Sequence, residues 1–407
     1  MTIDIRGLAA GEFRAWYRVV ESAFADEPNE AALTANERIF EMPRVLVAAD
    51  GERMVGGAGA FTFRLTVPGG EVAAAGVTAV GVLPTHRRLG TLTALMRRQL
   101  RDVQAAGEPV AVLWASEGSI YQRFGYGLAS LSSSLEIDQA RASFRTPQPP
   151  AGTLRMVEEA EAARTFPAIY DAVRAVTPGF IDRPGDWWEA EVLPDPEYRR
   201  RGAGPRFLVL HEVDGSPEGY LDYRVKSDWD EVGSKSSLLV RELMPATTRS
   251  SRELWRFCFG HDLIATVKGG VQPPDHPLLL MLDEPRRLRL MAGDGLWLRI
   301  LDVPAALRGR SYRTADSLTF DLLDGFLPEQ AGRWTLDTTG DSVSVVRTEA
   351  VAEMTLDTTD LAAMYLAGFS ATDLVRAGRC EGSSAAGIRK ADALFAWDRR
   401  PWCPFIF

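Results

Sequence analysis

Hydrophobic and polar positions alternate in the first part of the chain. Residues 44–66 alternate in this way and turn at Asp50–Gly51, which predicts a β-hairpin. A further strand is predicted over GVTAVGV, residues 76–82. The pattern then changes to helical spacing over LPTHRRLGTLTALMRRQLRDV. The apolar positions with this spacing are Leu89, Leu92, Met96, Leu100 and Val103. A short apolar run, VAVLWAS at residues 110–116, predicts the next strand. Strand, helix and strand together indicate one parallel crossover unit.

The hydrophobic pattern breaks at TPQPPAG, residues 146–152, where proline and turn residues gather. An acidic helix, VEEAEAARTF, and a hairpin turning at Asp214–Gly215 are predicted after this break. The next stretch, VRELMPATTRSSRELWRF, resembles VTAVGVLPTHRRLGTLTALM, because both run from a strand through a proline into a helix. Pro84 then matches Pro245, Gly90 falls on Ser251, and Arg87 falls on Thr248. We predict a weak internal repeat whose second copy has lost its glycine.

A third pattern starts near Met291. Short strands are predicted in LWLRIL, SLTFDLL, RWTLDTTG and SVSVV, and helices in TDLAAMYL and ATDLVRAG, with Asp357 or Thr358 as the first helix's N-cap. This arrangement indicates a separate α+β domain ending in the aromatic tail RRPWCPFIF. The predicted domains are therefore residues 1–148, 149–290 and 291–407.

Composition narrows the class of protein. The chain has 407 residues, 46% of them hydrophobic and 25% charged, which is ordinary for a soluble globular protein. Its net charge of −9 argues against a nucleic-acid surface and favours a cationic partner. No apolar run approaches a membrane span, and the first residues do not resemble a signal peptide. The three cysteines form neither a disulfide framework nor a CxxC site, and the histidines have no metal spacing. We expect a cytoplasmic protein without a metal.

The stretch THRRLGT is the first candidate for chemistry. A glycine between a strand and a helix lets backbone N–H groups approach a phosphate, and the helix start attracts the anion. Arg87 and Arg88 add positive charge, while His86 is expected to face solvent. The alternative is a solvated basic helix start, since neither a Walker loop nor a dinucleotide fingerprint is present.

A tyrosine follows the next strand, in SEGSIYQRFGYG. Open parallel sheets bind ligands at the carboxyl ends of their strands, so Tyr121 is expected near whatever lies on the glycine loop. The alternative is a packed tyrosine whose hydroxyl is satisfied within the core.

These segments together resemble the GNAT family of acetyl-CoA-dependent N-acetyltransferases. The pyrophosphate motif [RQ]xxGx[GA] stands here at residues 87–92, with leucine in place of the last small residue. The stretch IYQRFGY at residues 120–126 corresponds to the family's later IYxxxGF-like segment. More narrowly, the chain resembles the Eis branch of this family in VTAVGVLPTHRRLG, AVLWASEGSIYQRFGYG and the aromatic C-terminus. This resemblance covers the whole length of the chain. The resemblance implies a mixed α/β, α+β protein: two tandem GNAT domains, the second degenerate, and a sterol-carrier-protein-like domain.

The resemblance also implies roles for residues of the first domain. The pantetheine arm of acetyl-CoA would pair with the backbone of Val80, Gly81 and Val82, as with a strand edge. The amides that would hold the pyrophosphate are those of Arg88, Leu89, Gly90, Thr91, Leu92 and Thr93. Ser116 and Glu117 would lie beside the cofactor, and Tyr121 would protonate the departing thiolate. A phenol of pKa about 10 is a weaker acid than a thiol of about 8.5, so the donor stays protonated until needed.

The resemblance gives the tail a role as well. The carboxylate of Phe407 would accept a proton from the substrate amine, although a free carboxylate of pKa about 3.5 is a weak base by itself. The alternative is that Trp402 to Phe407 only dock the terminus. Phe24 and Asp26 would line the amine pocket, or else simply end a helix. Ile406 stands where family members can carry an acidic residue, which affects substrate preference.

We therefore expect an N-acetyltransferase that acts directly, without an acyl-enzyme, on small polycationic amines such as aminoglycosides. The resemblance implies a homo-oligomer, a hexamer of paired trimers. Peptide lysine acetylation and transfer of a longer acyl group stay open. So does a coenzyme A- or lipid-binding protein without turnover.

Overall fold

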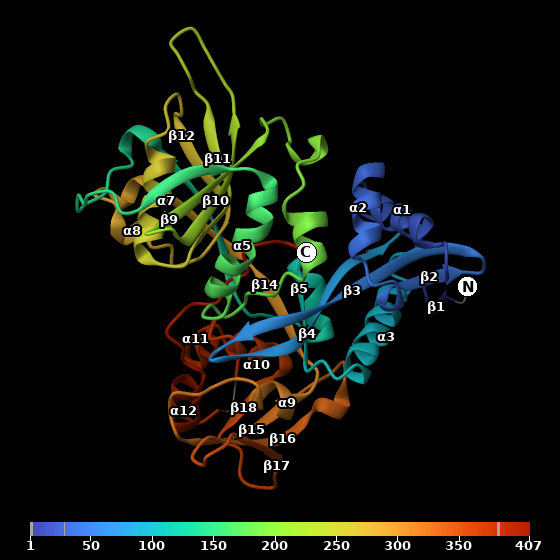
Figure 1. Ribbon diagram of the computed structural model, residues 1–407. Helices are drawn as coiled ribbons and strands as arrows, with labels where there is room; N and C mark the ends of the chain where they lie inside the picture. Colours follow the sequence, from blue (N-terminus) through green and yellow to red (C-terminus); the bar gives the residue numbers. More distant parts are fainter. Residues whose placement is uncertain (1–2, 28, 381–382) are drawn as a thin grey trace. The chain divides into compact units, whose positions relative to one another are not determined.

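The computed structural model describes residues 3–27, 29–380 and 383–407 (Figure 1). The chain divides into two compact units. The first contains Met1–Ser130, Asp294–Pro401 and Ile406–Phe407, and the second contains Leu131–Gly293 and Trp402–Phe405. None of the helices in the described residues is long and apolar enough to cross a membrane.

The first unit is built on a seven-stranded sheet with the order β1-β2-β3-β4-β5-β14-β6. The strands are β1 (Ile3–Gly7), β2 (Leu46–Asp50), β3 (Arg53–Val67), β4 (Gly70–Val82), β5 (Val110–Trp114), β6 (Gly127–Leu128) and β14 (Leu296–Ile300). The helices are α1 (Phe13–Ala23), α2 (Glu30–Ile39), α3 (Thr91–Ala105) and α4 (Gly118–Tyr121). Figure 1 shows α1 and α2 on one side of the long β3–β4 hairpin and α3 on the other.

The predicted hairpin and crossover unit are confirmed. β2 and β3 pair in antiparallel fashion, with Asp50 opposite Arg53, and β4 pairs in parallel with β5. Helix α3 buries Leu95, Met96, Leu100 and Val103 on one face, as its spacing requires. The predicted start of the helix is wrong, because Leu89 precedes the first turn and is 55% exposed.

The second unit has its own seven-stranded sheet, with the order β13-β7-β12-β11-β10-β9-β8. The strands are β7 (Leu131–Asp138), β8 (Thr153–Val157), β9 (Arg206–Val213), β10 (Ser216–Lys226), β11 (Ser237–Pro245), β12 (Thr266–Gln272) and β13 (Arg289–Asp294). The helices are α5 (Glu159–Arg174), α6 (Gly185–Trp187), α7 (Thr248–Phe259) and α8 (Leu278–Met281). The predicted acidic helix is α5, and the predicted hairpin at Asp214–Gly215 joins β9 to β10.

Two strands belong to sheets that their sequence positions did not predict. The segment LWLRIL forms a strand, β14, but its partners are β5 and β6 of the first sheet rather than strands of the C-terminal part. Conversely, β7 follows β6 closely in sequence and pairs with β12 of the second sheet. The first sheet thus includes a strand from beyond residue 290, and the second sheet includes a strand from before residue 148. The domain boundaries at 148 and 290 stay predictions.

The C-terminal part contributes a four-stranded sheet with the order β17-β16-β15-β18. Its strands are β15 (Ser317–Leu323), β16 (Gly332–Asp337), β17 (Ser344–Arg347) and β18 (Met354–Asp357), and its helices are α9 (Val303–Arg308), α10 (Thr358–Tyr365), α11 (Ala371–Arg376) and α12 (Ala385–Phe395). The predicted N-cap is confirmed, since Asp357 accepts from the Asp360 amide in a reciprocal capping box. Helix α10 is buried along its whole length and packs on β14 and β6.

A fully buried ion pair joins the C-terminal part to the first sheet. Arg299 of β14 donates from Nη2 to Asp324 Oδ2 at 2.5 Å and from Nη1 to Thr358 Oγ1 at 2.6 Å. The other Asp324 oxygen accepts from the amides of Phe326 and Leu327. The ion pair therefore fixes β14, the loop after β15 and the start of α10 at one point.

We expect Arg299→Met to lower the free energy of unfolding by about 3–5 kcal/mol, because it leaves the buried Asp324 carboxylate without its cation. Urea-induced unfolding would measure the loss. The control is Arg333→Gln, which breaks a pair with Asp321 whose side chains are 36% and 32% exposed and should cost about 1 kcal/mol or less. Equal losses in the two variants would contradict the importance of the buried pair.

Candidate active site

The strands β4 and β5 separate in the middle of the first sheet. They pair only from Ala74–Gly76 to Val110–Val112, while β4 continues to Val82 with β3 on its other edge. A β-bulge interrupts β4 at Ala79, whose φ is +52°. Beyond Gly76, the edge of β4 that faces β5 has no strand partner in the described chain. The predicted residues Val80, Gly81 and Val82 lie in this segment, where a ligand can add as a strand would.

The glycine loop follows β4 directly. Gly90 is the N-cap of α3 at φ +83°, and a Cβ built on it would meet nothing within 4 Å. Gly90 has no side chain that could cap the first turn of this 15-residue helix, and the space in front of it is open. Thr91 is the exception in this loop, because its side chain is buried and donates to His86 O at 3.3 Å.

The two arginines of the loop differ in their surroundings. Arg87 donates to the carbonyls of Ala23 at 2.7 Å and Val82 at 3.2 Å, so it ties the end of α1 to the end of β4. Arg88 is exposed and has φ +64°. Both arginines are exposed, and they differ in that two backbone carbonyls hold the guanidinium of Arg87.

The expectation that His86 faces solvent is wrong. Its side chain is buried, with Nδ1 2.8 Å from Thr85 Oγ1 and Nε2 3.7 Å from Asp50 Oδ2. The short turn over Pro84–His86 directs the ring inward. The hydrogen bond to Thr85 offsets the cost of burying this polar ring.

Tyr121 ends helix α4, just beyond β5. Its ring is buried in a cluster that includes Ala75, Val77 and Met96, and it meets Tyr126 edge to face at 5.9 Å. Burial raises the pKa of Tyr121 to about 12. The predicted cofactor neighbours Ser116 and Glu117 are exposed at the end of β5, and Glu117 is the N-cap of α4.

Phe24 and Asp26 follow the last turn of α1. Phe24 is 46% exposed, and a Cβ built on Gly81 would lie 3.5 Å from its ring. The chain turns back here, since the Asp26 amide donates to Glu21 O at 3.0 Å. Burial, and then the negative charge of Asp26, raise the pKa of the Glu21 carboxyl. The sequence pattern does not indicate Glu21 as a site residue, because only this turn brings it close to Asp26.

The C-terminal residue lies at the point where β4 and β5 separate. The Phe407 ring packs edge to face on Phe63 of β3, with centroids 5.3 Å apart. A Cβ on Gly76 would collide with the Phe63 ring and lie 3.2 Å from Phe407, so glycine leaves room for both rings. Gly76 is the last residue of β4 that pairs with β5. Ile406 is 64% exposed.

Successive residues of a strand face opposite sides of the sheet, and this places the site residues on two faces. Ala75 and Val77 belong to the cluster that holds Tyr121 and the α3 residue Met96. Gly76 faces the other side, toward Phe63 and Phe407, and Gly81 faces Ala23 and Phe24 of the α1 region. Tyr121 and α3 are thus on one face of the sheet, while Phe24 and Phe407 are on the other.

The second unit repeats the strand–helix layout but has no equivalent loop. Only two residues separate β11 from α7, whereas eight separate β4 from α3. The N-cap is Thr247, which accepts from the Ser250 amide and donates to Glu218, a carboxylate that also binds Arg249. The predicted match of Gly90 with Ser251 is wrong, because Ser251 is buried inside α7. The protein's own groups fill this helix start.

Comparison with known proteins agrees with this architecture. Residues 4–129 and 179–300 each match an acetyltransferase (GNAT) domain family, and residues 303–404 match a sterol carrier protein domain family. An uncharacterized N-acetyltransferase of Streptomyces avermitilis is 38% identical over the full length of both chains. The N-acetyltransferase Eis of Mycobacterium tuberculosis is 33% identical over 98% of each chain. The crystal structure of Eis1 from Mycobacterium abscessus superposes with a TM-score of 0.87 at 33% identity, covering 99% of this chain and 100% of that one.

The fold and these matches define an N-acetyltransferase with two GNAT domains and a sterol-carrier-protein-like domain. Within that class, the chain belongs to the Eis family. GNAT acetyltransferases use acetyl-CoA, and the free edge of β4 and the open α3 start fit its pantetheine arm and pyrophosphate.

Proposed function

We propose that this enzyme transfers the acetyl group of acetyl-CoA to amines of small polycationic molecules such as aminoglycosides. The observation that carries the proposal is the placement of Tyr121 and Phe407 on opposite faces of the sheet, both bordering β4 where it leaves β5. A thioester held in that gap would have a proton donor on one side and a carboxylate on the other.

Tyr121 acts as the general acid in this proposal. With a pKa near 12, its hydroxyl keeps its proton throughout the neutral and mildly alkaline range. The hydroxyl gives that proton to the sulfur as the thiolate departs, and the more acidic thiol is then the stable product.

The C-terminal carboxylate of Phe407 acts on the amine. An alkylammonium of pKa about 10 must lose a proton before its nitrogen can attack. The carboxylate attracts the cation and takes up its proton, directly or through a water molecule. Gly76 and Phe63 hold the last residue in place for this role.

The surroundings of Phe24 support a cationic substrate. Glu21 and Asp26 bring two negative charges to the end of α1, and their mutual repulsion is relieved when a cation binds between them. A molecule with several ammonium groups satisfies these acids and the terminal carboxylate together.

Tyr121→Phe is expected to lower kcat by about 10²–10⁴-fold without weakening acetyl-CoA binding, because only the proton donor is lost. Thiol release with aminoglycosides, a spermidine-like amine and a lysine peptide would measure kcat. The control is Tyr126→Phe: the Tyr126 hydroxyl is buried without a hydrogen-bond partner among the described residues, so its loss should leave kcat nearly unchanged. An equal effect of the two variants would exclude Tyr121 as the acid.

Gly90→Asp is expected to abolish acetyl-CoA binding, because it places a side chain and a negative charge before the α3 amides. Calorimetric titration with acetyl-CoA would measure the loss. Gly107→Asp is the matched control, since Gly107 has φ +77° and open space around it at the other end of α3. It carries the same backbone strain and should keep its affinity. Equal loss in both variants would attribute the effect to strain.

One glycine added after Phe407 should abolish turnover while acetyl-CoA binding persists, because it displaces the carboxylate by about 3.8 Å. Ile406→Ala changes an exposed tail side chain but keeps the terminus, so it should retain activity. Full turnover by the extended chain would return the tail to a packing role. Acetyl-CoA binding without turnover of any amine by the unmodified chain would favour a coenzyme A-binding protein.

A further inference from the structure

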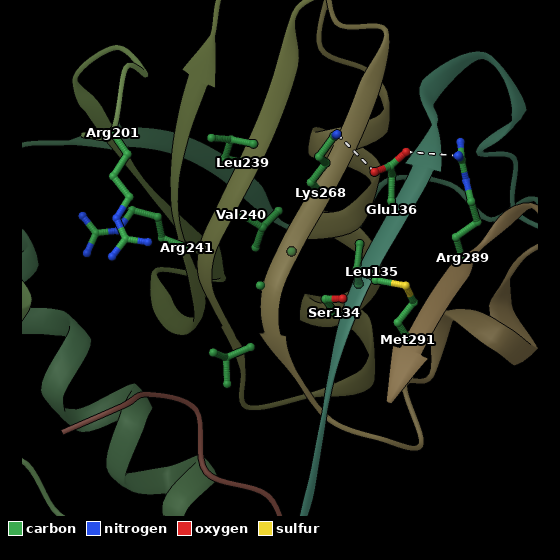
Figure 2. A pocket seen from close by; sticks show the side chains of 13 residues that line it. Ser134, Leu135, Glu136, Arg201, Leu239, Val240, Arg241, Lys268, Arg289 and Met291 are labelled. Atoms are coloured by element: carbon green, nitrogen blue, oxygen red, sulfur yellow. Dashed lines mark ion pairs between the residues drawn. The ribbon is translucent and has the colours of Figure 1, made fainter. Parts of the chain in front are cut away.

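A cavity of about 730 Å³ opens on the sheet of the second unit (Figure 2). Its lining comes from β7, β11, β12 and β13, with Arg201 from the segment before β9. The size is typical of sites for small organic ligands. The cavity is separate from the acetyl-CoA site, whose residues all belong to the first unit.

The middle of the cavity is apolar. Leu135 and Val240 are buried members of the core beneath it, Leu239 is half-buried, and Met291 is 70% exposed. Figure 2 shows Leu239 and Val240 between the arginines Arg201 and Arg241 on one side and Lys268 on the other. Covering such an apolar surface with an apolar ligand removes it from water and is therefore favourable.

The cations on one side of the cavity are neutralised within the protein. Lys268 Nζ lies 3.1 Å from one oxygen of Glu136, and Arg289 Nη1 lies 3.2 Å from the other. Arg289 Nη2 also bonds to Asp138 at 3.0 Å. These ion pairs, two of which are dashed in Figure 2, leave this side nearly balanced.

The cations on the other side are not neutralised. Among the described residues, Arg201 forms no ion pair, and the single ion pair of Arg241 is a long one, 3.8 Å to Asp222. Asp222 is already bound at 2.6 Å by Arg206. Arg241 Nη1 is buried and has no hydrogen-bond partner in the described part of the chain.

The backbone explains why Arg241 lies here. Asp222 of β10 pairs with Glu242 and Tyr223 pairs with Val240, so Arg241 is the extra residue of a β-bulge in β11. A bulge redirects a side chain from the regular alternation. Burial, and the nearby cations Arg206 and Arg224, lower the pKa of Arg241 despite the opposing effect of Asp222. An anion at this point would relieve that repulsion.

We propose that this cavity binds a small anionic amphiphile. Its carboxylate or phosphate group binds between Arg201 and Arg241, and its apolar body covers Leu239 and Met291. The site is independent of acetyl transfer, so its failure would leave the proposed function intact. It differs from an acetyl-CoA site because the start of the helix that follows β11, at Thr247, is filled by the protein's own side chains.

Calorimetric titration of the full chain with monomeric dodecanoate and dodecyl phosphate tests the proposal. We expect both to bind. Dodecanol, which lacks the charge, and inorganic phosphate or acetate, which lack the apolar body, should bind at least tenfold more weakly. A preference between the two anionic amphiphiles would identify the head group. Binding of dodecanol or of inorganic phosphate as tight as that of the amphiphiles would overturn the proposal.

Arg241→Gln should weaken dodecyl phosphate binding by at least tenfold, because it removes a charge-assisted hydrogen bond. Arg286→Gln is the charge-matched control: Arg286 is exposed, lies outside the cavity and should keep the affinity. Met291→Glu, at an exposed position, should weaken binding through the apolar part. Turnover and acetyl-CoA affinity should be unchanged in all three. Equal affinity in the Arg241 and Arg286 variants would place the ligand elsewhere and refute the site.

Discussion

β4 and β5 share hydrogen bonds over only three residues on each strand, and the candidate active site depends on this short pairing. Unpaired strand edges inside a sheet are costly unless another partner takes up their backbone groups. Here the free edge runs from beyond Gly76 to Val82 and leads directly into the glycine loop. In the proposed reaction, the thioester cosubstrate supplies the missing strand while its phosphates meet the helix start. Because of this gap, side chains on both faces of the sheet could reach the same thioester bond.

The sheet remains stable despite this gap because further strands pair on the far side of β5. β14 pairs with β5 along its whole length and with β6, and the buried Arg299–Asp324 pair binds β14 to the C-terminal part. The guanidinium also lies against Gly125, where any Cβ would collide with it. Gly125 belongs to the turn that follows Tyr121. The sterol-carrier-protein-like domain thus supports the segment that carries the proposed acid.

Local patterns in the sequence predicted much of the fold. The hairpins at Asp50–Gly51 and Asp214–Gly215, the crossover unit and the Asp357 cap all follow from turn chemistry and periodicity, which act over a few residues. The strands that pair with β14 could not be predicted in this way, because a short apolar strand fits equally well in either sheet. The counterpart of Gly90 in the second unit was not predictable either, because the two proline-containing segments are similar in sequence although their loops differ in length.

The candidate site was predictable where a motif fixes the backbone, as at Gly90, and where a strand end fixes a position, as at Tyr121. It was not predictable where side chains choose between partners. His86 turns inward to Thr85, and Arg87, although exposed, donates to the carbonyls of Ala23 and Val82. Glu21 and Asp26 are close together because of a backbone turn, and the spacing of apolar residues does not predict such a turn.

The exchange of strands between the two large sheets has a consequence for biosynthesis. When the ribosome has made the first 150 residues, β5 and β6 are present, but the strand that lies between them is still about 150 residues away. Until β14 emerges, the nascent first sheet exposes an unprotected edge of the kind that promotes aggregation. A truncated first domain should for that reason express poorly, because the partner strand for β5 and β6 is supplied by a segment made much later.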